Sequence, residues 1–209
     1  MSALRPALVL AACGLAVACS AVMQREAGPP SSAQVKAELQ ASFKANGQAK
    51  LDRLDQDDVQ RLCSQVRADK PLSPQDAQSI VHSQQATLRY PEGSLMGDWK
   101  NGEKVAQQGT GKQYTDDPTH PSGANCYACH QLSPHELSYG TIGPSLYRFG
   151  ATHGYTPEMQ KYVYGKVYNS EAFSACSTMP RFGHMGILTE QQIKDVVALL
   201  MDPKSPVNQ

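Results

Sequence analysis

Apolar residues in this chain mostly recur every three or four positions, the spacing that places side chains on one face of an α-helix. No stretch shows the convincing period-two alternation that is typical of a half-buried strand. The pattern therefore predicts an all-α fold. Six helices are expected: from Ala33 to a stop at Asn46-Gly47, over Val59–Val66, from Ser73-Pro74 toward Leu88, over Trp99–Gln108, from Thr156-Pro157 through Val167, and from Thr189 through Leu200.

Several of these helices start with residues that favour capping. Asp55 and Asp57 precede the second helix, whose spacing places Cys63 on the apolar face. Thr189 and Gln192 form the pattern of a capping box before the last helix. These signals make the start of each helix easier to predict than its end.

Turn residues and changes of composition divide the chain into five segments. We expect a signal peptide over 1–21, a Gly-, Pro- and Ser-rich linker over 22–32, and a helical extension over 33–91. A second helical domain is expected over 92–203, followed by a C-terminal tail over 204–209.

The composition limits the choice of partners. The chain has 209 residues, 40% of them apolar, enough for one domain with a proper core plus an extension. Lys and Arg together number 19, as do Asp and Glu. The formal net charge is therefore zero, so charge gives no reason to expect nucleic acid or an anionic membrane surface as a partner.

The N-terminus has the features of an export signal, because Arg5 precedes an apolar run over 7–18 that is too short to span a bilayer. Cys13 and Cys19 both follow small residues, and cleavage before Cys19 leaves the longer apolar run. Two alternatives stay open: lipid modification of Cys19, or ordinary cleavage near 18–21. Either one predicts a periplasmic protein, attached to a membrane only if it is lipidated.

The six cysteines form three pairs of different character. Two belong to the signal region, two to a Cys-x-x-Cys-His motif, and Cys63 and Cys176 are left over. An oxidising compartment would join the leftover pair in a disulfide. The alternative is a buried apolar Cys63 and a free thiol at Cys176.

The motif Cys126-Tyr127-Ala128-Cys129-His130 carries the main chemical signal. Two thiols on one helical turn can form thioethers with the haem vinyl groups, and the adjacent imidazole then becomes the proximal iron ligand. A zinc site would need a second ligand pair, and a thioredoxin-like site would need a βαβ context; neither is found in the sequence. We therefore expect one covalent haem c, with electron transfer as its chemistry.

The opposite axial ligand is expected to be Met179, in a Met-Pro-Arg-Phe-Gly loop just before the last helix. Met185 and His184 are rivals if the loop register shifts, whereas Met159 lies on a helical apolar stripe. A distal site without methionine would instead allow peroxidase or ligand-sensing activity.

Pro144 is the expected hydrogen-bond acceptor for the proximal imidazole, because its carbonyl can be aimed at His130 while Gly143 allows close approach. The alternative is an ordinary turn. Cys176 precedes Met179 by three residues, so a bond to Cys63 would fasten the extension to the ligand loop.

Beyond these single features, the sequence resembles the SoxX-type cytochrome subunit of the bacterial SoxAX thiosulfate-oxidising complex. The segments that carry the resemblance are Gly97-Asp98-Trp99-Lys100-Asn101-Gly102-Glu103, Gly123–Leu132 around the haem motif, Gly140-Thr141-Ile142-Gly143-Pro144-Ser145-Leu146, Met179-Pro180-Arg181-Phe182-Gly183, and the end through Ser205-Pro206-Val207-Asn208. They span most of the 92–203 domain.

The resemblance implies a class I cytochrome c-like domain and a heterodimer with a SoxA-like cytochrome. The complex would act as an L-cysteine S-thiosulfotransferase, coupling thiosulfate to a cysteine of a SoxYZ-like carrier protein, with the active site on the SoxA-like partner. This chain would pass the electrons to a small soluble cytochrome c, using Cys126, Cys129, His130 and Met179 to hold its haem. The alternative is a free-standing periplasmic electron carrier.

Overall fold

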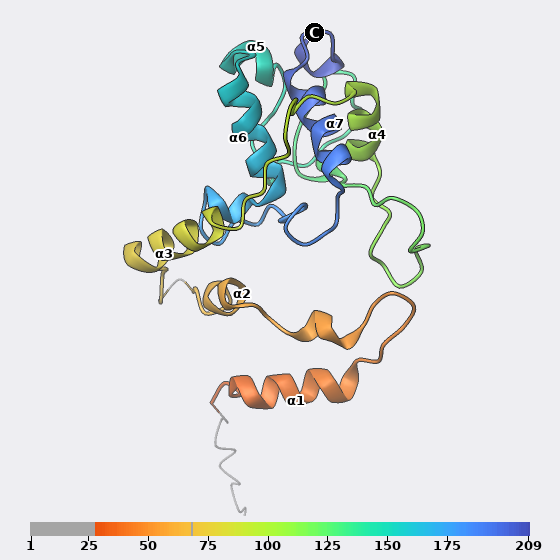
Figure 1. The fold of residues 1–209 in the computed structure, drawn as a ribbon. Coiled ribbons are helices and arrows are strands. Elements are labelled where there is room, and N and C mark those ends of the chain that lie inside the picture. The colour runs from red at the N-terminus through yellow and green to blue at the C-terminus, as the bar shows by residue number, and fades with distance from the viewer. Residues whose placement is uncertain (1–27, 68) are drawn as a thin grey trace, which may run out of the picture.

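The structure is a computed structural model that describes residues 28–67 and 69–209, and within them the chain is helical (Figure 1). The α-helices are α1 (Ser32–Ser42), α2 (Asp58–Cys63), α3 (Pro74–Gln85), α4 (Trp99–Gln107), α5 (Phe149–His153), α6 (Pro157–Tyr168) and α7 (Glu190–Met201). Short 3-10 helices are η1 (Leu51–Leu54), η2 (Cys126–Ala128), η3 (Ser170–Ala172) and η4 (Pro206–Asn208). The described residues include no β-strand, only two isolated bridges, so the all-α prediction is confirmed.

The N-terminal predictions fall only partly within the described residues. The expected signal peptide over 1–21, including Cys19, lies outside them, as does the linker up to residue 27. Helix α1 starts one residue earlier than expected, because Ser31 caps it in a capping box with Gln34.

The capping side chains explain where the helices begin. The Ser73 hydroxyl accepts the backbone N–H of Asp76 at 3.0 Å at the start of α3. Thr189 and Gln192 form the predicted capping box of α7. Asp57 caps α2, whereas Asp55 lies one turn earlier, at the end of η1.

The packing of α4 against α7 forms the centre of the haem-motif domain (Figure 1). Gly102 permits the close approach, since a Cβ there would lie 2.1 Å from the carbonyl oxygen of Asp195. The buried Asp195 carboxylate accepts the backbone N–H of Asp98 at 2.8 Å. The apolar core includes Val105, Ala106, Val163, Val167, Ile193, Val196, Val197, Leu199, Leu200 and Val207.

The last residues pack into the domain and extend the core. Val207 is fully buried, and its carbonyl accepts the backbone N–H of Arg148 at 2.7 Å. The Asn208 amide donates to the carbonyl of Leu200 at 3.1 Å. These contacts also hold α5, a short helix that the apolar pattern did not predict.

In α1 the apolar stripe does not lead to burial. None of its residues is buried; Val35 is 42% exposed, and Phe43, which ends the helix, is 55% exposed. Similarly, α2 ends at Cys63, so Val66 lies beyond it and is exposed. Periodicity predicted the helices correctly here but overestimated the surface that they cover.

The extension meets the domain through α2 and α3. Figure 1 shows α2 between the domain and α1. Helix α3 packs against η3, where the Gln84 side-chain oxygen Oε1 accepts the buried Asn169 side-chain amide at 3.0 Å. Across the part of the chain that the structure describes, no helix combines the length and apolarity needed to cross a membrane.

Candidate haem site

The Cys-x-x-Cys-His motif forms a tight turn at η2. The backbone N–H groups of Cys129 and His130 both donate to the Cys126 carbonyl, at 3.1 and 2.9 Å. Side chains three residues apart are nearly eclipsed in a 3-10 helix, so Cys126 and Cys129 project from the same side of the turn. Neither forms a disulfide, and burial raises the pKa of the Cys126 thiol to about 12.

The glycine-rich loop after the motif packs directly onto this turn. The backbone N–H of Gly140 donates to the Tyr127 carbonyl and that of Gly143 to the Cys129 carbonyl, both at 2.8 Å. A Cβ at Gly140 would lie 1.8 Å from the carbonyl oxygen of Ala128. Only a residue without a side chain permits this contact between two backbone segments.

The loop also fixes the orientation of the proximal imidazole. His130 Nδ1 lies 2.7 Å from the carbonyl oxygen of Pro144. A carbonyl oxygen only accepts, so Nδ1 carries the proton and Nε2 keeps its lone pair for a metal. A Cβ at Gly143 would lie 2.1 Å from Cε1 of the ring, so the loop backbone contacts the imidazole itself.

Met179 lies in the segment 176–181 between η3 and α7. Its carbonyl accepts the Ser170 hydroxyl at 2.5 Å, and its backbone N–H donates to the Ser177 hydroxyl at 3.2 Å. Met179 is half-buried and packs against the same apolar core as Cys126. The proximal turn and the Met179 segment therefore belong to one packed unit.

The rival ligands lie in different surroundings. Met159 packs partly buried against the core on α6, whereas Met185 is 50% exposed. His184 is partly buried, and burial followed by the charge of Arg181 lowers the pKa of its imidazole. Its backbone N–H donates to the carbonyl of Tyr168, so its loop position is fixed.

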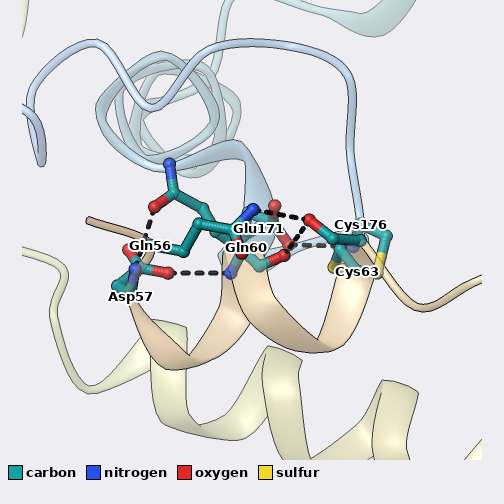
Figure 2. Close-up of a disulfide and its surroundings, with 7 residues drawn as sticks. Gln56, Asp57, Gln60, Cys63, Glu171 and Cys176 are labelled. Atoms are coloured by element: carbon teal, nitrogen blue, oxygen red, sulfur yellow. Dashed lines mark hydrogen bonds between the residues drawn. A yellow bond between two sulfur atoms is a disulfide. The ribbon is translucent and has the colours of Figure 1, made fainter. Parts of the chain in front are cut away.

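Cys63 of α2 and Cys176 of the Met179 segment form a disulfide across 113 residues of sequence (Figure 2). Their Cα atoms are 5.4 Å apart. Cys176 has φ +55°, in the left-handed region, and its backbone N–H donates to the Glu171 carboxylate at 2.8 Å. The bond places the extension directly beside Met179, three residues further along.

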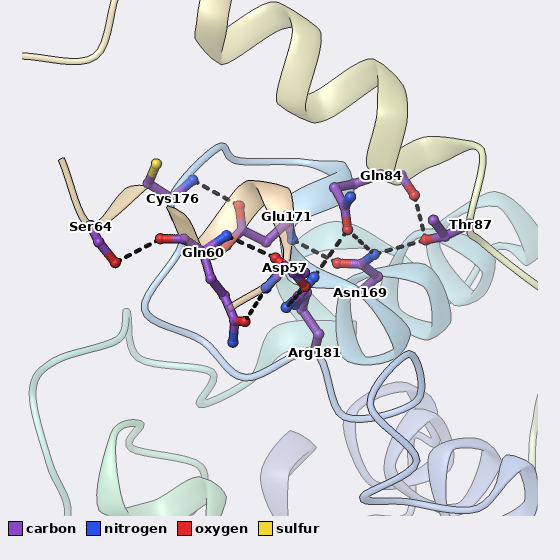
Figure 3. A network of polar contacts seen from close by, with 9 residues as sticks. All are labelled: Asp57, Gln60, Ser64, Gln84, Thr87, Asn169, Glu171, Cys176 and Arg181. Atoms are coloured by element: carbon purple, nitrogen blue, oxygen red, sulfur yellow. Dashed lines mark hydrogen bonds and ion pairs between the residues drawn. The ribbon is translucent and has the colours of Figure 1, made fainter. Parts of the chain in front are cut away.

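Arg181, two residues after Met179 in the sequence, belongs to a polar network (Figure 3). Arg181, only 7% exposed, donates to Asp57 Oδ2 at 2.6 Å and to Gln84 Oε1 at 3.4 Å. Burial alone would raise the pKa of Asp57. Hydrogen bonds from the backbone N–H of Gln60 and from the Arg181 guanidinium, together with the charge of Arg181, nevertheless hold this pKa below its usual value. The apolar pattern identified Asp57 only as a helix cap; its spacing contains no signal for a partner 124 residues away.

The segment also borders a cavity shared with the extension. The cavity, of about 620 Å³, has Met179, Met185 and Ile187 on the domain side. The extension contributes the opposite wall, with Arg53, Asp55, Gln56, Gln60, Cys63 and Ser64. No residue of the Cys126–His130 turn lines this cavity.

The donor groups on this scaffold fit a covalent haem. Two unpaired thiols lie on one turn beside an imidazole with a free Nε2, and a thioether is held in a second loop of the same core. Thiols add to the haem vinyl groups as thioethers, and imidazole and thioether are ligands of electron-transfer haem iron. Bound in this way, haem c supplies a reversible one-electron change of its iron.

The helical fold and this site define a protein with one covalently attached haem, and comparison with known proteins gives its family. The cytochrome c family profile matches residues 100–203. A protein of Aquifex aeolicus (strain VF5), called "Uncharacterized lipoprotein", is 40% identical over 157 residues, 73% of this chain and 73% of its own. The chain belongs to the cytochrome c family, and its cofactor is haem c.

A solved structure, SoxXA from P. pantotrophus, is also similar to this chain. The match has 25% sequence identity and a TM-score of 0.39, and it covers 58% of this chain and 92% of that one.

Proposed function

We propose that this chain is the electron-transfer haem subunit of a SoxAX-like complex that oxidatively couples thiosulfate to a carrier-protein cysteine. The proposal combines the electron-transfer chemistry of the cytochrome c family with the resemblance of five segments to SoxX-type subunits. The Gly97–Glu103 and Asn125–Leu132 segments carry the most specific part of that resemblance.

Cys126 and Cys129 are the proposed thioether attachments, His130 the proximal ligand and Met179 the distal ligand. The observation that carries this assignment is the contact of His130 Nδ1 with the Pro144 carbonyl, which leaves Nε2 free for iron. An imidazole held in one orientation limits rearrangement between the two redox states. A Met179 thioether on the other face would fill the sixth iron position, which favours electron transfer over chemistry at an open iron site.

The proposed reaction releases electrons that this chain would have to carry away. A thiolate sulfur of the carrier and the outer sulfur of thiosulfate join in a new S–S bond, and the carrier thiol loses its proton. Two electrons leave the sulfur atoms, so a monohaem subunit must pass them on singly. A SoxA-like partner would supply the catalytic site, a SoxYZ-like protein the carrier cysteine, and a small soluble cytochrome c would accept the electrons.

Complex formation is tested by coexpression of the full chain with a SoxA-like cytochrome, followed by affinity purification and a redox-titrated optical spectrum. We expect a stable heterodimer that reduces a small cytochrome c when thiosulfate and the carrier are present. An unrelated monohaem cytochrome c serves as the control bait. A chain that stays monomeric beside the coexpressed partner would instead support the alternative, a free-standing periplasmic electron carrier.

The distal ligand is tested by Met179→Ala, with Met185→Ala as the matched control in the same loop. Loss of the sulfur-to-iron charge-transfer band in Met179→Ala alone supports the assignment. Persistence of the band in Met179→Ala contradicts it, and so does its loss in Met185→Ala.

The chain is also proposed to be exported by its N-terminal signal, cut before Cys19, and anchored through a lipid on that cysteine. The small residues before Cys19 and the lipoprotein relative support this assignment. Residues 22–32 would then link the membrane to the extension over 33–91 and the cytochrome c domain over 92–203. Mass spectrometry of the mature N-terminus tests it: an unmodified N-terminus at another residue overturns the lipid anchor.

A further inference from the structure

We propose that Arg181 and Asp57 are positioning residues for the distal ligand: their ion pair fastens the Met179 segment to the N-terminal extension. The inference rests on the proposed function only in taking Met179 as the iron ligand. It makes the extension a working part of the haem site.

The first reason is the placement of the contacts along the segment. Cys176, three residues before Met179, is bonded to Cys63 of α2, and Arg181, two residues after it, pairs with the cap of the same helix. Helix α2 therefore holds the segment on both sides of the thioether. A ligand between two fixed points keeps its position when its neighbours move.

The second reason is the burial of Arg181. A guanidinium with 7% exposure is costly unless charged or polar groups surround it, and its charged partner at hydrogen-bond distance is Asp57 at 2.6 Å. Without that carboxylate, Arg181 would lower its free energy by turning toward solvent. Any backbone shift that accompanies this turn would act only two residues from Met179.

The third reason is that the remaining contacts of the segment lead to the extension as well. The Ser170 hydroxyl holds the Met179 carbonyl, and the adjacent Asn169 amide donates to Gln84 and Thr87, at the C-terminal end of α3 and just beyond it, at 3.0 and 2.9 Å (Figure 3). The wall of the 620 Å³ cavity beside Met179 also comes from the extension. The disulfide, the ion pair and the η3–α3 contact thus restrain one short loop from three directions.

The test compares Asp57→Asn with Asp58→Asn in the holoprotein. Asparagine is as good a helix cap as aspartate, so Asp57→Asn can keep the cap of α2 through its Oδ1. The substitution replaces the carboxylate oxygen that accepts from Arg181 with an amide NH2, so both the charge and the hydrogen bond of the pair are lost. Asp58 is the matched control, since it is the next residue, its side chain is 88% exposed, and it pairs with Arg61 of its own helix.

We expect Asp57→Asn to weaken the sulfur-to-iron band, lower the reduction potential, and tighten the apparent binding of added imidazole about tenfold, the factor that about 1.4 kcal/mol represents. Asp58→Asn should match the wild type. Arg181→Lys keeps the positive charge but loses the planar set of guanidinium N–H donors, so its band, potential and imidazole affinity should lie between those of the wild type and Asp57→Asn. This variant replaces Asp57→Asn in the test if Asp57→Asn does not accumulate.

Each outcome has one meaning. A lower melting temperature in Asp57→Asn with unchanged band, potential and imidazole affinity makes the pair merely structural and overturns the inference. The same effects in Asp58→Asn overturn it too. A wild-type protein without the band, or a Met179→Ala variant that keeps it, refutes the ligand assignment instead and so identifies a failure of the proposed function.

Discussion

The two sides of the haem site are built in different ways. On the proximal side, a loop that ends at Pro144 holds the Cys126–His130 turn through two backbone hydrogen bonds of 2.8 Å, the 2.7 Å contact of the Pro144 carbonyl with the His130 ring, and glycines packed on the turn. On the side proposed as distal, the Met179 segment has local contacts to Ser170 and Glu171, and it is held in addition by side chains from residues more than 80 positions earlier in the chain. A local site of this kind is expected to tolerate loss of the extension, and a site held by distant contacts is not.

Gly143→Val should have the largest effect, because the group that must give way to the new side chain is the His130 imidazole itself. The new side chain would begin 2.1 Å from the imidazole and displace His130 from the Pro144 carbonyl. We expect loss of the low-spin haem spectrum and of most holoprotein, as measured by the haem band per mole of chain. Ile142→Ala is the control, since this neighbouring side chain is 74% exposed and should leave the spectrum intact.

Removal of the disulfide should come next, and it acts on the distal side. A double Cys63→Ala, Cys176→Ala variant frees a 113-residue loop, and the chain-entropy relation gives a loss of about 4–5 kcal/mol as an upper value. Chemical denaturation monitored by circular dichroism measures it. If the haem spectrum showed loss of the His130 ligand while the sulfur-to-iron band stayed unchanged, the division of the site into two halves would be wrong.

The difference between the halves also decides what could be predicted from the sequence. Features that involve residues close together in the sequence could be predicted. They are the haem motif, the caps of α3, α6 and α7, and the Pro144 acceptor, which lies one loop after His130. The Cys63–Cys176 pair was predicted only by counting cysteines, and its geometry came from the structure. The Asp57–Arg181 pair had no signal at all, because spacing contains no information about which distant side chain will meet a helix cap.

The acid response should separate the ion pair from the rest of the network. The pKa of Asp57 is lowered from 3.8 on folding, so its contribution to stability is complete above about pH 4 and is lost as the pH falls through the folded value. Burial raises the pKa of the nearby Glu171, which therefore takes up its proton before Asp57 does, and burial followed by the charge of Arg181 lowers the pKa of the His184 imidazole.

Unfolding free energies of the wild type and Asp57→Asn, measured across this range, should therefore converge only below about pH 4. A difference that closes between pH 5 and 7 would assign the effect to Glu171 or His184 rather than to Asp57.

Lys36→Ala should have the smallest effect, and it marks how far into the extension the coupling to the haem reaches. Lys36 of α1 pairs with Asp55 at 2.9 Å, with both side chains more than half exposed, and such pairs contribute about 0–1 kcal/mol. Because α1 has no buried residue and α2 carries the contacts to the Met179 segment, the reduction potential and the methionine band should stay unchanged. A shifted potential in this variant would show that the whole extension, and not α2 with α3 alone, positions the distal ligand.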